Sequence, residues 1–278
     1  MLTNMLVHML IALVLQGVTP AMRCQQGQAD RTAKKTTVQN VTVTIAPSPK
    51  PDDVEEACTA EVRDRSGKVV FQSQGFNTEL TDTNGRDIDN DGHPDIVVGT
   101  DTGGGNRCCW GYAVISPVPR PHLVAKLPPA HFESDDNGTT VIWTTVAFYD
   151  LGPSMAESPV VEQAQQFRKG RLEEITSQYC AGMLANQAHG YASMTDVFAQ
   201  LTTAQKRASQ QATSAPSDEV RQTRVAATTL ALQAVYCGRD DMAATIIRDV
   251  WPAAEQAPVR AMIQTALDKG NRRRDKGL

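Results

Sequence analysis

The chain has 278 residues, of which 41% are hydrophobic and 21% are charged. This length suits one or two domains, and the apolar fraction is sufficient for a packed core, which argues against global disorder. The net charge of −4 argues against a general nucleic-acid-binding protein. The short basic segment 271–278 is interpreted as a solvated terminal tail and not as a nucleic-acid site.

Residues 1–22 have the features of a signal peptide. The segment Leu6–Val18 is mostly apolar but too short to span a bilayer, and small residues at 19–21 offer a cleavage site. We therefore expect an exported protein, periplasmic or extracellular, with no integral membrane span in the mature chain. Cys24 follows closely, and a lipid anchor on its thiol is the alternative to ordinary cleavage.

Export makes disulfide bonds the expected state of the cysteines. Cys180 and Cys237 both follow a tyrosine in a region predicted to be helical, and a bridge between them is the preferred pair. Cys58 with Cys108 or Cys109 is the second expected pair, which leaves one thiol over. A zinc site is disfavoured because no CxxC pair occurs and no histidine lies at ligand spacing from a cysteine.

Residues 23–52 are predicted to be a linker, because polar residues dominate its beginning and alternate prolines end it. One short strand is expected within it, where valine and isoleucine alternate with threonine over 41–45. From 53 to 175 the pattern is that of β-structure, with short apolar or alternating runs separated by turns such as 65–68. The longest strand is expected over 140–149.

After about residue 176 the apolar period changes from two to nearly four, which predicts a helical domain over 176–270. Helices are expected to begin at 193–196 and at 217–219, and to end at Gly238 and Gly270. The predicted fold class is α+β. A small antiparallel β domain, either partly propeller-like or a sandwich, precedes an all-α domain.

The segment 87–95 carries the densest chemical signal, because four carboxylates in nine residues repel one another unless a hard cation gathers them. Gly92 stands where a calcium loop needs a sharp bend. Val98 occupies the position of the EF-hand glutamate, so the loop is not an EF-hand. The expected Ca²⁺ ligands are Asp87, Asp89, Asp91, His93 through its backbone carbonyl, and Asp95. The alternative is an acidic, solvent-facing turn that binds no metal.

The run Asp-Ile-Asp-Asn-Asp-Gly-His-Pro-Asp-Ile-Val-Val resembles the calcium loop of FG-GAP/VCBS-type repeats, found in integrin α-chain propellers and many exported bacterial proteins. The similarity covers residues 82–110, and 103–109 resembles a Gly-Gly-x-x-Cys-Cys element that follows such loops in some bacterial members. A degenerate second copy without a metal is expected over 132–149. The resemblance implies blade-like β units, of which this region has room for about two, too few to close a propeller.

The leading functional interpretation is non-enzymatic. It is an exported calcium-binding structural or protein-binding module of the cell envelope or exterior, with an unknown protein or envelope component as partner. The alternative is an envelope-directed hydrolase of sugar or peptide with structural calcium. The adjacent pairs Glu173-Glu174 and Asp135-Asp136 are the candidate carboxylates for such a hydrolase, although adjacent acidic residues are usually just solvated. Convergent carboxylates of perturbed pKa beside the loop would favour the hydrolase.

Overall fold

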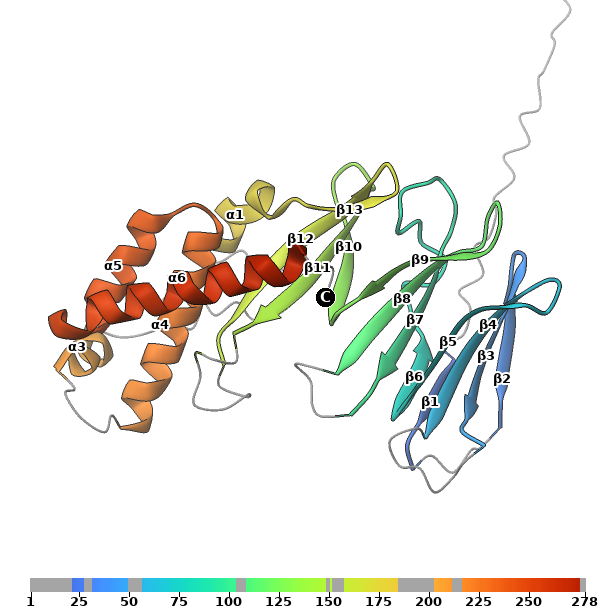
Figure 1. Cartoon of the computed structure of the whole chain (residues 1–278), viewed down its shortest axis with the longest axis horizontal. Helices are drawn as coiled ribbons and strands as arrows, with labels where there is room; N and C mark the ends of the chain where they lie inside the picture. The colour runs from blue at the N-terminus through green and yellow to red at the C-terminus, as the bar shows by residue number, and fades with distance from the viewer. Residues whose placement is uncertain are drawn as a thin grey trace, which may run out of the picture.

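The computed structural model describes residues 22–27, 32–49, 57–103, 109–148, 151, 158–184, 203–211 and 217–275. Three antiparallel sheets follow one another along the chain, and helices form the C-terminal part (Figure 1). The predicted α+β class, a β domain followed by a helical domain, is confirmed. Apart from Met22, the expected signal peptide lies outside the described residues, as does the helix start expected at 193–196.

The first sheet is a four-stranded meander in the order β2-β3-β4-β5. Its strands are β2 Lys34–Val38, β3 Val41–Pro47, β4 Cys58–Asp64 and β5 Val69–Gly75. Alternation buries Val41, Val43 and Ile45, while the intervening threonines lie on the opposite, partly exposed face. The expected linker over 23–52 was therefore wrong for the described residues, because a solvated outer face halves the apolar signal of a strand.

The second sheet has five strands in the order β1-β6-β7-β8-β9. They are β1 Arg23–Gln25, β6 Asn77–Leu80, β7 Ile96–Asp101, β8 Trp110–Ser116 and β9 His122–Leu127. The N-terminal strand β1 pairs with β6 and places Cys24 beside β4 of the first sheet. Cys24 forms a disulfide with Cys58 there, with their Cα atoms 5.8 Å apart.

This disulfide corrects two expectations. Cys58 does not pair with Cys108 or Cys109, because β1 brings Cys24 next to it. The Cys24 sulfur is bonded to another cysteine, so it is not available for a lipid anchor. Cys109 is also disulfide-bonded, whereas Cys108 lies outside the described residues.

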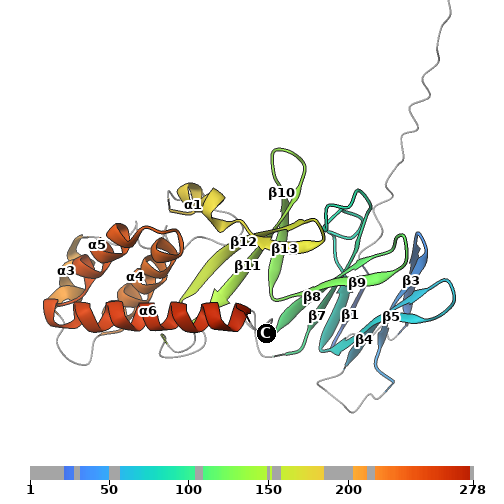
Figure 2. The same ribbon diagram turned by 45° about the horizontal axis from the view of Figure 1, so that its top comes forward.

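The third sheet is again a four-stranded meander, in the order β10-β11-β12-β13. Its strands are β10 Ala130–Ser134, β11 Thr140–Ala147, β12 Val160–Arg168 and β13 Arg171–Glu174. The three sheets stand side by side in chain order (Figures 1 and 2). Three such units exceed the two expected for this region, because the first begins inside the segment predicted to be a linker.

Two apolar cores separate the sheets. The core between the first and second sheets includes Val41, Val43, Ile45, Ala60, Val62, Leu80, Ile96, Val98, Ala113 and Ile115. The core between the second and third sheets includes Ile88, Val97, Val114, Leu127, Ile142 and Phe167. Successive side chains of β7 thus enter opposite cores, which explains why Ile96, Val97 and Val98 form an uninterrupted apolar run.

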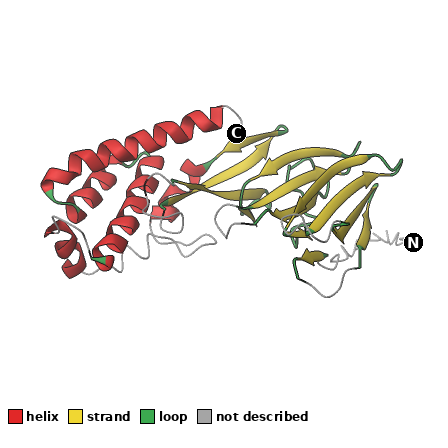
Figure 3. Cartoon of the chain, turned by 60° about the horizontal axis from the view of Figure 1, so that its bottom comes forward, coloured by secondary structure: helices red, strands yellow, loops and turns green. Residues whose placement is uncertain are grey.

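Helices pack against the third sheet in two apolar cores, one that includes Trp143 and Ala164 and one that includes Val161 (Figure 3). They are α1 Thr176–Leu184, α3 Thr203–Gln211, α4 Asp218–Tyr236, α5 Asp240–Val250 and α6 Ala253–Asp275. Tyr179 of α1 packs edge-on against Trp143 of β11, with ring centroids 5.0 Å apart. The side chain of Gln233 in α4 bonds both the backbone N–H (3.0 Å) and the backbone carbonyl (3.4 Å) of Glu162 in β12.

Capping residues in the sequence mark both ends of α4. Ser217 caps α4 through a hydrogen bond from Val220 N, and Gly238 has a left-handed φ of 68° just after that helix. The predicted Cys180–Cys237 disulfide is confirmed and joins α1 to the end of α4. Gly270 does not end the last helix, which continues into the expected tail, because one glycine costs a helix only about 1 kcal/mol. No described helix is long and apolar enough to cross a membrane.

Candidate metal centre

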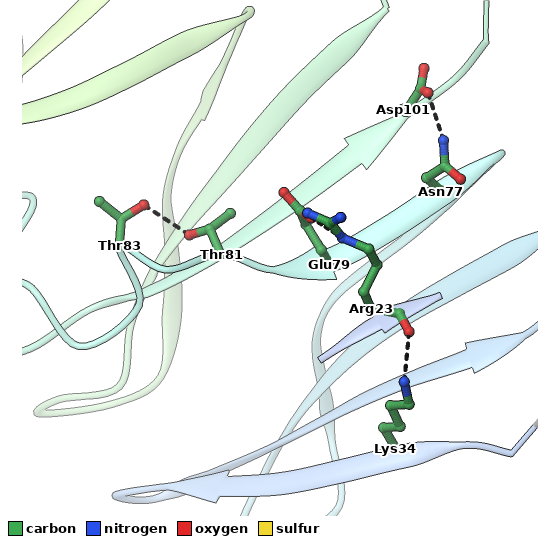
Figure 4. Close-up of polar contacts among 7 residues, drawn as sticks. All are labelled: Arg23, Lys34, Asn77, Glu79, Thr81, Thr83 and Asp101. Atoms are coloured by element: carbon green, nitrogen blue, oxygen red, sulfur yellow. Dashed lines mark hydrogen bonds and ion pairs between the residues drawn. The ribbon is translucent and has the colours of Figure 1, made fainter. Parts of the chain in front are cut away.

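The acidic loop connects β6 to β7, the strands that lie side by side in the second sheet. Polar contacts hold β6 on its way into the loop, including Arg23–Glu79 and Asn77–Asp101 at 2.8 Å (Figure 4). The hydroxyl groups of Thr81 and Thr83 lie 2.9 Å apart at the start of the loop. The loop therefore begins at the end of a strand whose position is held by these polar contacts.

Hydrogen bonds within the loop give it a definite shape. Asp95 N donates to Arg86 O at 2.7 Å, and Gly85 N donates to Asp95 O at 2.8 Å, which closes the base of the loop. Asp87 accepts from the backbone N–H groups of Asp91 (3.0 Å) and Gly92 (2.9 Å). These bonds bend the backbone so that carboxylates distant in the loop approach one another.

Three residues of the loop have a left-handed backbone, Gly85 at φ 90°, Asn90 at φ 59° and Gly92 at φ 89°. A Cβ atom at position 92 would meet nothing within 4 Å. Gly92 is therefore favoured by its backbone conformation and not by lack of space. Asparagine is among the non-glycine residues that adopt this conformation most readily, which suits Asn90 to its position.

Three of the five expected ligand residues converge. One carboxylate oxygen from each of Asp87, Asp89 and Asp95 lies within 4.8 Å of the others, and no other such group of His, Cys, Asp or Glu occurs among the described residues. Calcium binds oxygen at about 2.3–2.6 Å, so two ligands of one ion lie at most about 5 Å apart. The spacing of the three carboxylates therefore fits a single Ca²⁺ ion.

The Asp95 side chain provides an independent observation that favours a cation at this loop. The residue is fully buried, and its Oδ2 accepts hydrogen bonds from Ile88 N at 2.8 Å and Asp89 N at 3.0 Å. Its Oδ1 is buried without a hydrogen-bond partner. An unpaired carboxylate oxygen away from water is costly, and a bound cation would remove that cost.

The electrostatics of the loop agree with this geometry. Burial raises the pKa of Asp95 to about 7, and the charge of Asp89 adds to the effect against opposing backbone hydrogen bonds. Burial, followed by the charge of Asp91, raises the pKa of Asp89. Both carboxyl groups therefore resist ionisation, mainly because they are buried and to a smaller extent because neighbouring carboxylates repel their charge.

The other two expected ligands lie at the surface. Asp91 and His93 are exposed, and Asp91 Oδ1 accepts a hydrogen bond from His93 N at 2.8 Å. Asp91 is outside the converging group, so the ligand roles of Asp91 and of the His93 carbonyl stay predictions. Asn84, in the same loop, also has a buried Oδ1 that lacks a hydrogen-bond partner.

The carboxylate pairs considered for a hydrolase do not join this centre. Glu173 and Glu174 are successive, exposed residues of β13, so their side chains point to opposite faces of the sheet. Asp135 closes the β10–β11 turn by accepting from Asn137 N at 2.9 Å and Thr139 N at 2.8 Å. The turn within 132–149, where a degenerate second copy of the loop was expected, is therefore a tight hairpin turn.

Comparisons with known proteins give little further guidance. No family model matches the chain, and no curated protein matches it. A solved structure described as "Structure of a Xanthomonas Type IV Secretion System related protein" is similar at 10% sequence identity over 56% of this chain and 99% of that chain. Its TM-score of 0.23 is too low to carry an argument about fold or function.

Proposed function

We propose that the chain is an exported calcium-binding module related to FG-GAP/VCBS-type proteins. In this proposal Asp87, Asp89 and Asp95 form the centre of the Ca²⁺ site, and the Asp91 side chain and the His93 carbonyl complete the coordination. The observation that carries the proposal is the buried, unpaired Oδ1 of Asp95 beside two further carboxylates. Hard oxygen donors at this spacing favour Ca²⁺ over softer metals.

The wider architecture supports the same relationship. Each sheet contains a consecutive four-stranded antiparallel meander, as expected for blade-like units. The acidic loop joins two neighbouring strands and is followed by the apolar strand β7, as in the loops it resembles. The face of the first sheet turned away from the second is polar, which suits the open end of a short stack.

The proposed location is the periplasm or the cell exterior, with a structural or protein-binding role. The Cys24–Cys58 and Cys180–Cys237 disulfides support an oxidising compartment. Among the described residues, no second group of three or more converging His, Cys, Asp or Glu side chains occurs.

Titration calorimetry on chelator-stripped protein tests the proposal. Added Ca²⁺ should bind one strong site and should raise the thermal midpoint, because a ligand that binds only the folded state stabilises it. Asp89→Asn should abolish both effects. Asp82→Asn is the matched control, because Asp82 is an exposed carboxylate of the same loop outside the converging group. Absence of binding heat at millimolar Ca²⁺ would overturn the proposal.

A further inference from the structure

The acidic loop also forms part of the contact between the second and third sheets. Ile88 lies between the ligand residues Asp87 and Asp89 and is fully buried. It packs in the core that contains Val97 of the second sheet and Ile142 of the third. A displacement of Asp87 or Asp89 would therefore move Ile88, whose side chain fills space between the two sheets.

Three hydrogen bonds connect the same loop to the third sheet. Thr140 Oγ1, at the start of β11, donates to Asp87 O at 2.7 Å. Asn90 Oδ1 accepts from Thr140 N, and Asn90 Nδ2 donates to Phe167 O near the end of β12, each at 3.2 Å. Since Thr140 is 3% exposed, water competes little for these bonds.

We propose that Ca²⁺ occupancy of this loop controls how firmly the third sheet, together with the helices packed on it, is held against the second sheet. This inference rests on the proposed function. With no ion, repulsion between Asp87, Asp89 and Asp95 favours conformations in which the carboxylates separate. Separation displaces Ile88 and Asn90, which are adjacent in sequence to the ligands, from their contacts with the third sheet. The ion reverses this by gathering the carboxylates.

The coupling is local to one of the two contacts between sheets. The described contacts of the ligand-bearing loop segment 87–91 are made with β11, with β12 and with the core between the second and third sheets. The first sheet is joined to the second through the Cys24–Cys58 disulfide and a separate core. Ca²⁺ should therefore change local opening in the third sheet and leave the first sheet unaffected. The first sheet then serves as an internal reference within the same molecule.

Hydrogen exchange of the full chain, with saturating Ca²⁺ or with chelator, measures this coupling. Peptides from 130–147 and 158–168 should exchange about tenfold more slowly with Ca²⁺, because exchange reports local opening. Peptides from 34–47 and 58–75 should exchange at the same rate in both conditions. Protection by Ca²⁺ that is confined to 85–96 would overturn the inference while leaving calcium binding intact.

Two substitutions separate the coupling from the binding of the ion. Thr140→Val removes the hydroxyl contact with Asp87, and Asn90→Gly removes both Asn90 contacts while keeping the left-handed backbone. Neither residue is a proposed ligand, so the double variant should bind Ca²⁺ within about threefold of the unmodified protein while losing the Ca²⁺-dependent protection of 130–147 and 158–168. Thr145→Val, a partly buried threonine on the same strand, is the control and should keep that protection.

The outcomes are distinguishable. If the unmodified protein gives no binding heat with Ca²⁺, the proposed function fails. If the double variant binds Ca²⁺ and still gains full protection in the third sheet, Asn90 and Thr140 do not transmit the effect and the inference is overturned. Loss of protection in the double variant, with binding retained, supports the coupling.

Discussion

The first and second sheets are joined by a covalent bond, whereas the second and third sheets meet at a cluster of like charges. Cys24 links β1 to β4 beside an apolar core. At the other contact, Ile88 and Asn90 reach the third sheet from a loop that carries Asp87, Asp89 and Asp95. A disulfide in an oxidising compartment does not depend on ion concentration, whereas in our proposal the contact made by the acidic loop depends on bound Ca²⁺. In that proposal the stack of sheets combines a covalent contact with one that depends on the ion.

The largest expected effect follows from removing the disulfide that links the first and second sheets. Replacing Cys24 and Cys58 together by alanine should lower the free energy of unfolding by about 4 kcal/mol, because a cross-link over this sequence separation restricts the unfolded chain. The separation is 34 residues. Urea denaturation should show the same loss with Ca²⁺ and with chelator. A loss of stability that appears only with chelator would mean that the two contacts between sheets are not independent.

The next test weakens the contact between the second and third sheets by shortening an apolar side chain of the acidic loop. Ile88→Ala should cost about 3 kcal/mol, because it leaves a cavity in a fully buried position. It should also weaken Ca²⁺ binding, since the ordered loop that presents the ligands loses its core contact. Ile45→Ala, in the core between the first and second sheets, is the control: it should lose similar stability and keep Ca²⁺ affinity. Equal affinities in the two variants, measured by calorimetry, would contradict the link between Ile88 and the site.

A smaller effect, with a change of sign, is expected at Asp95. In chelator, Asp95→Asn should stabilise the protein by about 2 kcal/mol, because the buried and unpaired charge is removed. With saturating Ca²⁺ the same change should destabilise it relative to the unmodified protein, because a central ligand loses its charge. Asp82→Asn should change neither value. Thermal melts of the three proteins in both conditions give the answer, and the same sign in both conditions would argue against a cation at Asp95.

The convergence of acidic side chains could be predicted in part from sequence because these residues lie close together in the chain. Nine residues contain the converging carboxylates and the left-handed Gly92, but spacing alone did not separate Asp87, Asp89 and Asp95 from Asp91, which lies outside the converging group. The loop's contacts with the third sheet were not foreseen, because Thr140 and Phe167 lie far away in the sequence. An isoleucine between two aspartates was the one local signal, since a solvated turn gives no reason for a large apolar side chain there.

The errors in the fold have the same origin. The sequence of β2, Lys-Lys-Thr-Thr-Val, has almost no apolar signal because β2 is an edge strand of a sheet with one solvated face. The Cys24–Cys58 bridge depends on a three-residue strand that adds to β6, more than fifty residues away. By contrast, Cys180–Cys237 joins two segments whose helical character was evident, and that pair was predicted correctly.

The smallest predicted effect concerns the third contact of the stack, where helices meet the third sheet. Burial raises the pKa of Glu162 to about 7, and the charge of Glu133 adds to this effect. One buried carboxylate oxygen of Glu162 has no hydrogen-bond partner. The folded protein therefore keeps this proton up to about pH 7, whereas the unfolded chain releases it near the ordinary glutamate pKa of about 4.3.

The sign of the pH dependence follows from this difference. The contribution of protonated Glu162 to stability is fully present below the unfolded pKa and is lost as the pH rises through about 7. Glu162→Gln should remove this loss, so the variant should match the unmodified protein near pH 4.5 and exceed its stability by about 1 kcal/mol at pH 8, since partial exposure screens the charge. Urea midpoints should be measured at saturating Ca²⁺, because a bound ion would keep Asp95 ionised and prevent its titration from contributing to the pH dependence. Parallel pH curves for the two proteins would show that solvent or a nearby donor already satisfies Glu162, and that this contact, unlike the acidic loop, does not depend on charge.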